Sequence, residues 1–193
     1  MDWKLQLLEL EKQKKWDEAI ELMQNVIKAN PEDMDAYINM NYLLMNLLVE
    51  EDCDPSKQED CETLLKWYFD ESYTKFSNNA EYLYFMGRTA VMGEWFFGID
   101  QEDYEAMIEK AKILEPENLI YKESYYWELS HENPLDPELI AYAKWVVKHN
   151  SPIRQYLSAK GSIGEYLLEL KENWAKGVLE NAQDFEKNKL LYH

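Results

Sequence analysis

The chain has 193 residues, and 46% of them are hydrophobic, which is enough for a packed core. Its 38 acidic residues outnumber 20 basic ones and give a formal net charge of −18. Such a charge repels nucleic-acid phosphates and anionic lipid but attracts a basic partner, so we expect neither nucleic acid nor membrane as a ligand. No apolar run approaches the ~20 residues of a membrane span, and the first residues do not look like a secretory signal. These features favour a cytoplasmic location.

The segment 16–33 has the clearest helical pattern. Apolar side chains recur there at helical spacing, at Ala19, Ile20, Met23, Val26 and Ile27. Asn30 precedes Pro31, and a residue before proline is pushed out of helical geometry. The helical period then restarts at Met34 and continues to Leu47. Two helices joined by so short a connection are expected to lie nearly antiparallel.

These residues resemble the tetratricopeptide repeat family. That family has an aromatic before its second helix, a small residue within it, a later apolar position and a closing proline. The matching residues in this chain are Trp16, Ala19, Val26 and Pro31. Trp3 corresponds to the aromatic of the first helix, whereas Leu7 stands where the family prefers a small residue. Gly87 supplies that small residue in a later unit.

Later breaks predict further units. Candidate unit ends are Pro31, the turn at 77–79, Pro116 and Pro152, separated by 47, 38 and 36 residues, against a family period of about 34. The long interval contains the acidic stretch 50–62, which we expect to be an inserted loop, and the stretch 93–103 replaces a tight turn. We therefore predict an all-α fold, an α-solenoid of stacked antiparallel helix pairs, as one domain over residues 1–193. Its expected parts are units 1–33, 34–79, 80–118 and 119–152 and a C-terminal cap, 153–193.

Two candidate surfaces for a partner follow. The first consists of the two acidic insertions, because insertions in repeat proteins map to one face that often binds. Its carboxylates are Glu51, Asp52, Asp54, Asp100, Glu102 and Asp103. The second is the concave surface that the resemblance implies for the first helix of each pair. Its residues are Asp35, Tyr42, Glu81, Tyr84, Arg88, Glu123 and Trp127.

The sequence lacks the common motifs of catalysis and metal binding. The three histidines are far apart, and there is no HExxH, no CxxC pair, no glycine-rich phosphate loop and no GxSxG. The stretch 52–63 imitates a calcium loop, but Lys57 and Thr63 occupy the positions of its glycine and its bidentate glutamate. We expect no enzymatic activity, no cofactor and no bound metal.

The sequence thus predicts a protein-binding scaffold. Its charge favours an acidic inhibitor that neutralises a basic protein such as a nuclease toxin. Immunity proteins of bacterial toxin systems resemble this chain in size and charge, although no motif identifies one. The alternative is a tetratricopeptide-type adaptor or co-chaperone that binds peptide tails in its concave groove. A third interpretation is a small hydrolase. Which surface binds, and in what oligomeric state, is left open.

Overall fold

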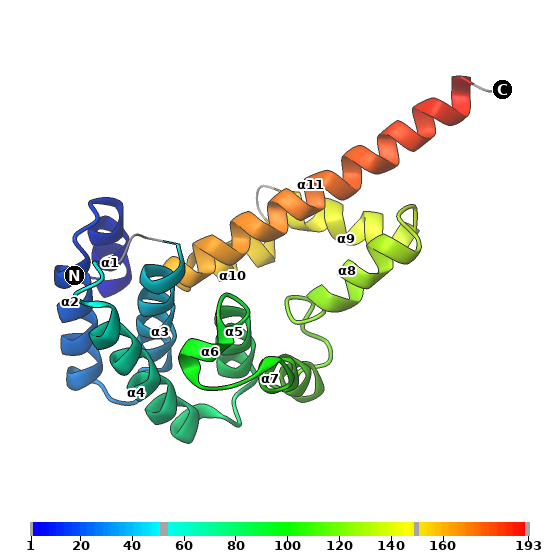
Figure 1. Cartoon of the computed structure of the whole chain (residues 1–193). Coiled ribbons are helices and arrows are strands. Elements are labelled where there is room, and N and C mark those ends of the chain that lie inside the picture. Colours follow the sequence, from blue (N-terminus) through cyan, green and yellow to red (C-terminus); the bar gives the residue numbers. More distant parts are fainter. Residues whose placement is uncertain (1, 51–53, 149–150, 192–193) are drawn as a thin grey trace. The chain divides into compact units, whose positions relative to one another are not determined.

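The structure is a computed structural model that describes residues 2–50, 54–148 and 151–191, the last six of them by their backbone alone. These residues form eleven helices and no strand, which confirms the predicted all-α class (Figure 1). None of the described helices is long and apolar enough to cross a membrane. The chain divides into two compact units, Met1–Asn118 with Gly161–Ile163, and Leu119–Lys160 with Gly164–His193. That one repeat domain spans residues 1–193 stays a prediction.

The first unit is built from seven described helices that pack on the next helix in the chain or on the one after it. Its helices are α1 (Trp3–Lys12), α2 (Trp16–Ala29), α3 (Met34–Val49), α4 (Gln58–Phe76), α5 (Ala80–Ala90), α6 (Glu94–Phe97) and α7 (Gln101–Leu114). Helix α1 packs on α2, α2 on α3, and α3 on both α4 and α5, while α5 packs on α7 (Figure 1). The helices predicted on either side of Pro31 are confirmed as α2 and α3.

Helix α3 lies at the centre of the first unit, and eleven of its sixteen residues are buried. Asp33 caps its start by accepting a hydrogen bond from the Ala36 amide at 3.1 Å. Helix α5 is buried even more completely, with nine of its eleven residues, and at Gly87 it meets α7 closely. A Cβ atom at Gly87 would lie 2.6 Å from Ile108 Cγ1, so this position requires the small residue that the family resemblance assigns to it.

Two expectations about helix boundaries were wrong. The stretch 50–62 is not a loop throughout, because α4 already begins at Gln58. Glu59 and Asp60 lie in its first turn, where negative charge stabilises the positive end of the helix dipole. Pro152 does not close a unit but is the first residue of a helix, a position where proline loses no hydrogen bond.

The second unit contains α8 (Glu123–Glu132), α9 (Pro137–Val147), α10 (Pro152–Ser158) and most of α11 (Ser162–Leu191). The rings of Tyr126 in α8 and Tyr142 in α9 are stacked, with centroids 3.8 Å apart and planes within 8°. Lys171 of α11 is only 3% exposed, and its Nζ donates to Glu123 Oε2 of α8 at 2.8 Å. Ring stacking and a nearly buried ion pair therefore hold these helices together.

Candidate protein-binding surface

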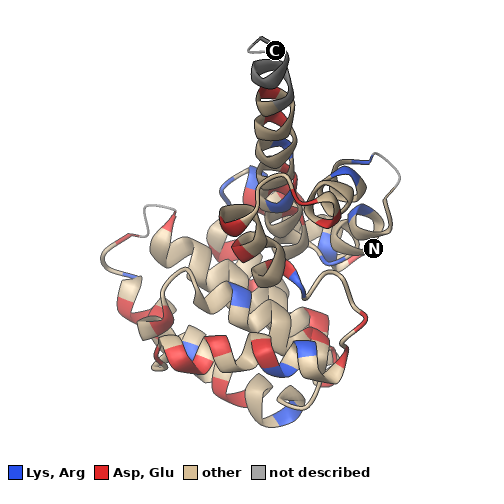
Figure 2. Cartoon of the chain, turned by 90° about the vertical axis from the view of Figure 1, so that its right-hand side faces the viewer, with Lys and Arg blue, Asp and Glu red and all other residues tan. Residues whose placement is uncertain are grey.

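The formal charge is divided unequally between the two units. The first unit has 27 acidic and 11 basic residues, a net charge of −16, whereas the second has 11 and 9, a net charge of −2. The acidic positions lie on many helices and are not confined to one loop (Figure 2). The first unit therefore attracts a basic partner more strongly than the second unit does.

Several acidic residues of the predicted insertions have structural contacts of their own. Asp100 and Asp103 form a capping box at the start of α7, in which each carboxylate accepts from the other's amide, at 3.1 and 3.0 Å. Asp54 Oδ1 accepts from the Ser56 amide and hydroxyl, at 2.9 and 2.8 Å. These hydrogen bonds, the one from the amide first, hold the pKa of Asp54 below its usual value.

The remaining acids of the insertions lie near these contacts along the chain. Glu102 is exposed in the first turn of α7. Glu51 and Asp52 lie outside the described residues. That the insertions bind a partner stays a prediction, and local helix starts and turns already account for Asp54, Asp100 and Asp103.

The residues predicted for the concave surface differ widely in exposure. Tyr84 is fully buried and Tyr42 is 7% exposed, so neither presents its ring to a partner. Asp35 forms an ion pair with Lys4, and Glu81 and Arg88 are half-buried. The last two predicted residues belong to the second unit: Glu123 pairs with Lys171, and Trp127 is 54% exposed.

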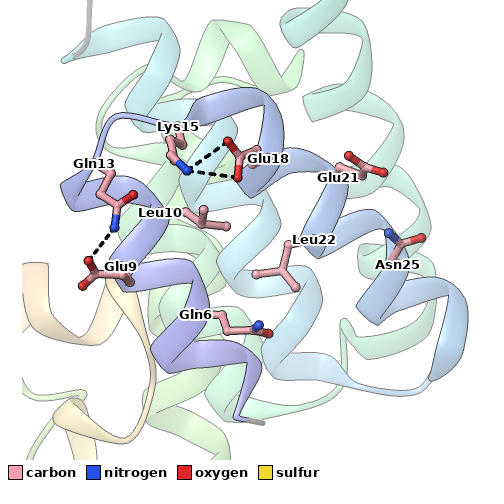
Figure 3. Close-up of a pocket in the computed structure, with 9 residues that line it drawn as sticks. All are labelled: Gln6, Glu9, Leu10, Gln13, Lys15, Glu18, Glu21, Leu22 and Asn25. Carbon is pink, nitrogen blue, oxygen red and sulfur yellow. Dashed lines mark hydrogen bonds and ion pairs between the residues drawn. The ribbon is translucent and has the colours of Figure 1, made fainter.

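A groove between α1 and α2, here the α1–α2 groove, is an acidic surface of the first unit (Figure 3). It has a volume of about 530 Å³. Its lining residues are Gln6, Glu9, Leu10, Gln13, Lys15, Glu18, Glu21, Leu22 and Asn25. Three carboxylates and one ammonium give these residues a formal charge of −2.

Both walls of the groove repeat one side-chain pattern. Helix α1 and its C-cap contribute positions 6, 9, 10 and 13, and α2 contributes positions 18, 21, 22 and 25. In each case this is the i, i+3, i+4, i+7 spacing of one helix face. Each wall has a glutamate followed by a half-buried leucine at its centre, Glu9 with Leu10 and Glu21 with Leu22. The leucines point toward the middle of the groove, and the glutamates lie on opposite sides of it (Figure 3).

The opposite faces of the same helices are buried, and this directs the groove outward. Leu7 of α1 and Ala19 and Met23 of α2 are 0% exposed. The connection between the helices is a tight Schellman turn, in which the Lys15 amide donates to the Leu10 carbonyl and the Lys14 amide to the Glu11 carbonyl, both at 2.9 Å. Lys14 has the left-handed φ of 54° that this turn requires.

The carboxylates of the groove differ in what already binds them. Glu9 Oε1 accepts from Gln13 Nε2 at 2.6 Å, and Lys15 Nζ lies 3.3 Å from Glu18 (Figure 3). Glu21 makes no hydrogen bond or ion pair with any other described residue, and it is exposed. The groove can therefore accept donors from a cationic partner on both walls.

A buried carboxyl lies on the far side of α1. Burial raises the pKa of Glu11 to about 7, against a smaller lowering by the hydrogen bond from the Ser162 hydroxyl. Its Oε1 is buried without a hydrogen-bond partner among the described residues. This group makes stability depend on pH, and it does not line the groove.

A metal site and matching proteins were both sought as a guide to function. Within the part of the chain that the structure describes, no group of three or more His, Cys, Asp or Glu side chains is placed to hold a metal ion. Comparison with protein-family models, with curated proteins and with solved structures found no match. The α1–α2 groove and the charge of the first unit are therefore the features that bear on function.

Proposed function

We propose that the chain is a non-enzymatic scaffold that binds and neutralises a basic protein, such as a nuclease toxin, through its first unit. In this proposal the helices stack as tetratricopeptide-like antiparallel pairs in the cytoplasm. The observation that carries the proposal is the division of charge, −16 in the first unit against −2 in the second. A field of that sign concentrates a cationic partner near the first unit and speeds the encounter.

The α1–α2 groove is the proposed contact. Leu10 and Leu22 offer apolar surface along its middle, with Glu9 and Glu21 beside them. A basic amphipathic helix matches this arrangement, because its apolar stripe covers the leucines while its Lys and Arg side chains reach the carboxylates. The leucines then slow dissociation, and the exposed carboxylates mainly raise the association rate.

The alternative, an adaptor that takes peptide tails in a concave groove, has less support. It needs the aromatic rings of Tyr42 and Tyr84 at the surface of the groove, and both residues are buried. We therefore prefer an inhibitor of a basic protein, with charge as the main source of selectivity.

The test uses two variants that remove the same charge from different units. Glu9, Glu18 and Glu21 line the groove, whereas Glu128, Glu132 and Glu180 are exposed in the second unit. Each set is changed to Gln, and both variants are used with the parent chain for affinity capture from source cells at low salt, followed by a salt gradient. We expect a basic protein on the parent and second-unit columns, and its loss or earlier elution from the groove column. Equal retention on both variant columns would contradict the groove as the contact, and capture of neutral proteins alone would contradict the proposal.

A further inference from the structure

The second unit has a pocket of a different kind from the α1–α2 groove. This α8–α11 pocket has a volume of about 490 Å³ and lies between α8, the turn after it, and α11. Two indole rings line it, those of Trp127 and Trp174, together with His131. Among the described residues, none that lines the pocket carries a carboxylate, an ammonium or a guanidinium group. An uncharged ligand with a flat face fits such a lining.

Gly177 lies in the middle of α11 and lines the pocket. A Cβ atom added there would meet no atom within 4 Å. At Gly164, near the start of the same helix, a Cβ would lie 1.9 Å from the Leu157 carbonyl oxygen, so packing requires that glycine. Packing does not require Gly177, although glycine is among the least favourable residues in a helix interior. The bare backbone at Gly177 therefore leaves room for a molecule to approach α11 closely.

Hydrogen-bonding groups flank this open position. Asn173 and Asn181 lie four residues before and after Gly177, which separates them by about 12 Å along the helix axis. Their amides can both donate and accept, and they have no hydrogen-bond partner among the described residues. On the α8 side, His131 Nδ1 lies 2.8 Å from the Trp127 carbonyl oxygen. Because that oxygen only accepts, Nδ1 is the donor in this hydrogen bond, and Nε2 makes no hydrogen bond to it.

We propose that the α8–α11 pocket binds an uncharged oligosaccharide of at least two rings. The C–H face of a sugar ring packs against an indole, and sugar hydroxyls both donate and accept, as the flanking amides do. A phosphorylated or carboxylated ligand would find no cationic side chain among those that line the pocket. The distance between the two amides exceeds one six-membered ring, and for that reason the ligand is longer than a monosaccharide. This site is independent of the binding of a basic protein by the first unit.

Indole N–H signals in ¹⁵N NMR spectra give a direct readout of the pocket, with those of Trp127 and Trp174 assigned from single Trp→Phe variants. The probes are maltose, cellobiose, lactose and N,N′-diacetylchitobiose, with adenosine and indole as planar comparators. We expect at least one disaccharide to shift both signals in a saturable way. The shifts should disappear in Gly177→Leu, which fills the open space, and persist in Gln183→Leu, which adds the same bulk at an exposed position of α11 outside the pocket.

A second variant guards against a folding defect in the first. Asn173→Ala with Asn181→Ala removes the flanking amides from exposed positions and should weaken disaccharide binding at least tenfold, with an unchanged circular dichroism spectrum. The proposal is overturned if no disaccharide of the panel shifts the two indole signals, if only adenosine or indole does so, or if the shifts survive both the Gly177 and the double Asn variant.

Discussion

The two units have similar helices but very different surfaces. The first unit carries −16 and has a groove with three glutamates, while the second carries −2 and has a pocket without a charged side chain among its described lining residues. Almost all of the net charge of −18 therefore belongs to the first unit. A regional charge of this kind favours two ligand chemistries in one chain, a basic protein for one unit and an uncharged molecule for the other.

The largest expected effect concerns the buried carboxyl of the first unit. Because burial raises the pKa of Glu11 to about 7 from 4.5, the folded state binds the proton more tightly than the unfolded state. The proton on Glu11 therefore favours the folded state at acidic pH. The free energy of unfolding falls by roughly 3 kcal/mol as the pH rises from about 4.5 to about 7 and this proton is lost. The side chain of Glu11→Gln stays neutral at every pH. Its free energy of unfolding, relative to that of the parent chain, should therefore rise by about the same amount between pH 4.5 and pH 8.

Urea unfolding of both proteins at the two pH values measures this difference. Glu9→Gln is the control, because Glu9 is an exposed carboxylate of the same helix. It should follow the pH dependence of the parent chain. If Glu11→Gln and the parent lost stability in parallel as the pH rose, Glu11 would not be the proton-binding group.

The second effect separates apolar from charged contacts in the α1–α2 groove. Leu10→Ser with Leu22→Ser should weaken binding of a captured basic partner by about tenfold to a hundredfold, because each half-buried leucine contributes roughly 1 kcal/mol or more of apolar contact. Surface plasmon resonance should show the loss mainly as faster dissociation, equally at low and high salt. A loss found only in the association rate would contradict the assigned role of the leucines.

A smaller effect compares two glycines of α11. Gly177→Ala should stabilise the second unit by about 1 kcal/mol, since alanine favours a helix interior and its Cβ enters open space. Gly164→Ala should instead destabilise the chain, because its Cβ would overlap the Leu157 carbonyl. Thermal unfolding followed by circular dichroism measures both, and a destabilising Gly177→Ala would mean that this space is already filled.

The smallest effect lies in the turn between α1 and α2. Lys14 adopts a left-handed φ of 54°, which an L side chain with a Cβ disfavours. Lys14→Gly should therefore stabilise the first unit by about 0.5 kcal/mol and leave the groove in place. Urea midpoints of the two proteins decide this, with Lys12→Gly as a control that should destabilise because Lys12 lies in the last turn of the α1 helix.

Local features of the sequence predicted some helix ends, such as the one at Pro31, whereas the surfaces depended on packing. The break at Pro31 follows from the chain itself, and the structure has it. The family resemblance implied a small residue at Gly87, and packing against Ile108 requires one there. The start of α4 was not predicted, because a run of acidic residues is typical both of a helix start and of a solvated loop. The burial of Tyr42 and Tyr84 depends on which helices pack over them, and helical spacing alone does not contain that information.

The sequence contains a repeated pattern that could have predicted the candidate groove. Positions 6, 9, 10 and 13 recur twelve residues later as 18, 21, 22 and 25, with Glu-Leu at the centre of both sets. The apolar stripe of α2 predicts only which face of that helix is buried. Which other face remains uncovered becomes visible only when the neighbouring helices are in place.

The most direct test of the central claim is the salt dependence of the association rate with a captured basic partner. Two variants carry the same charge change, the Gln replacements of Glu9, Glu18 and Glu21 and those of Glu128, Glu132 and Glu180. We predict that the groove variant associates more slowly at low salt and responds less to added salt than the second-unit variant does, which should follow the parent chain. Equal rates and equal salt slopes for the two variants would contradict the account.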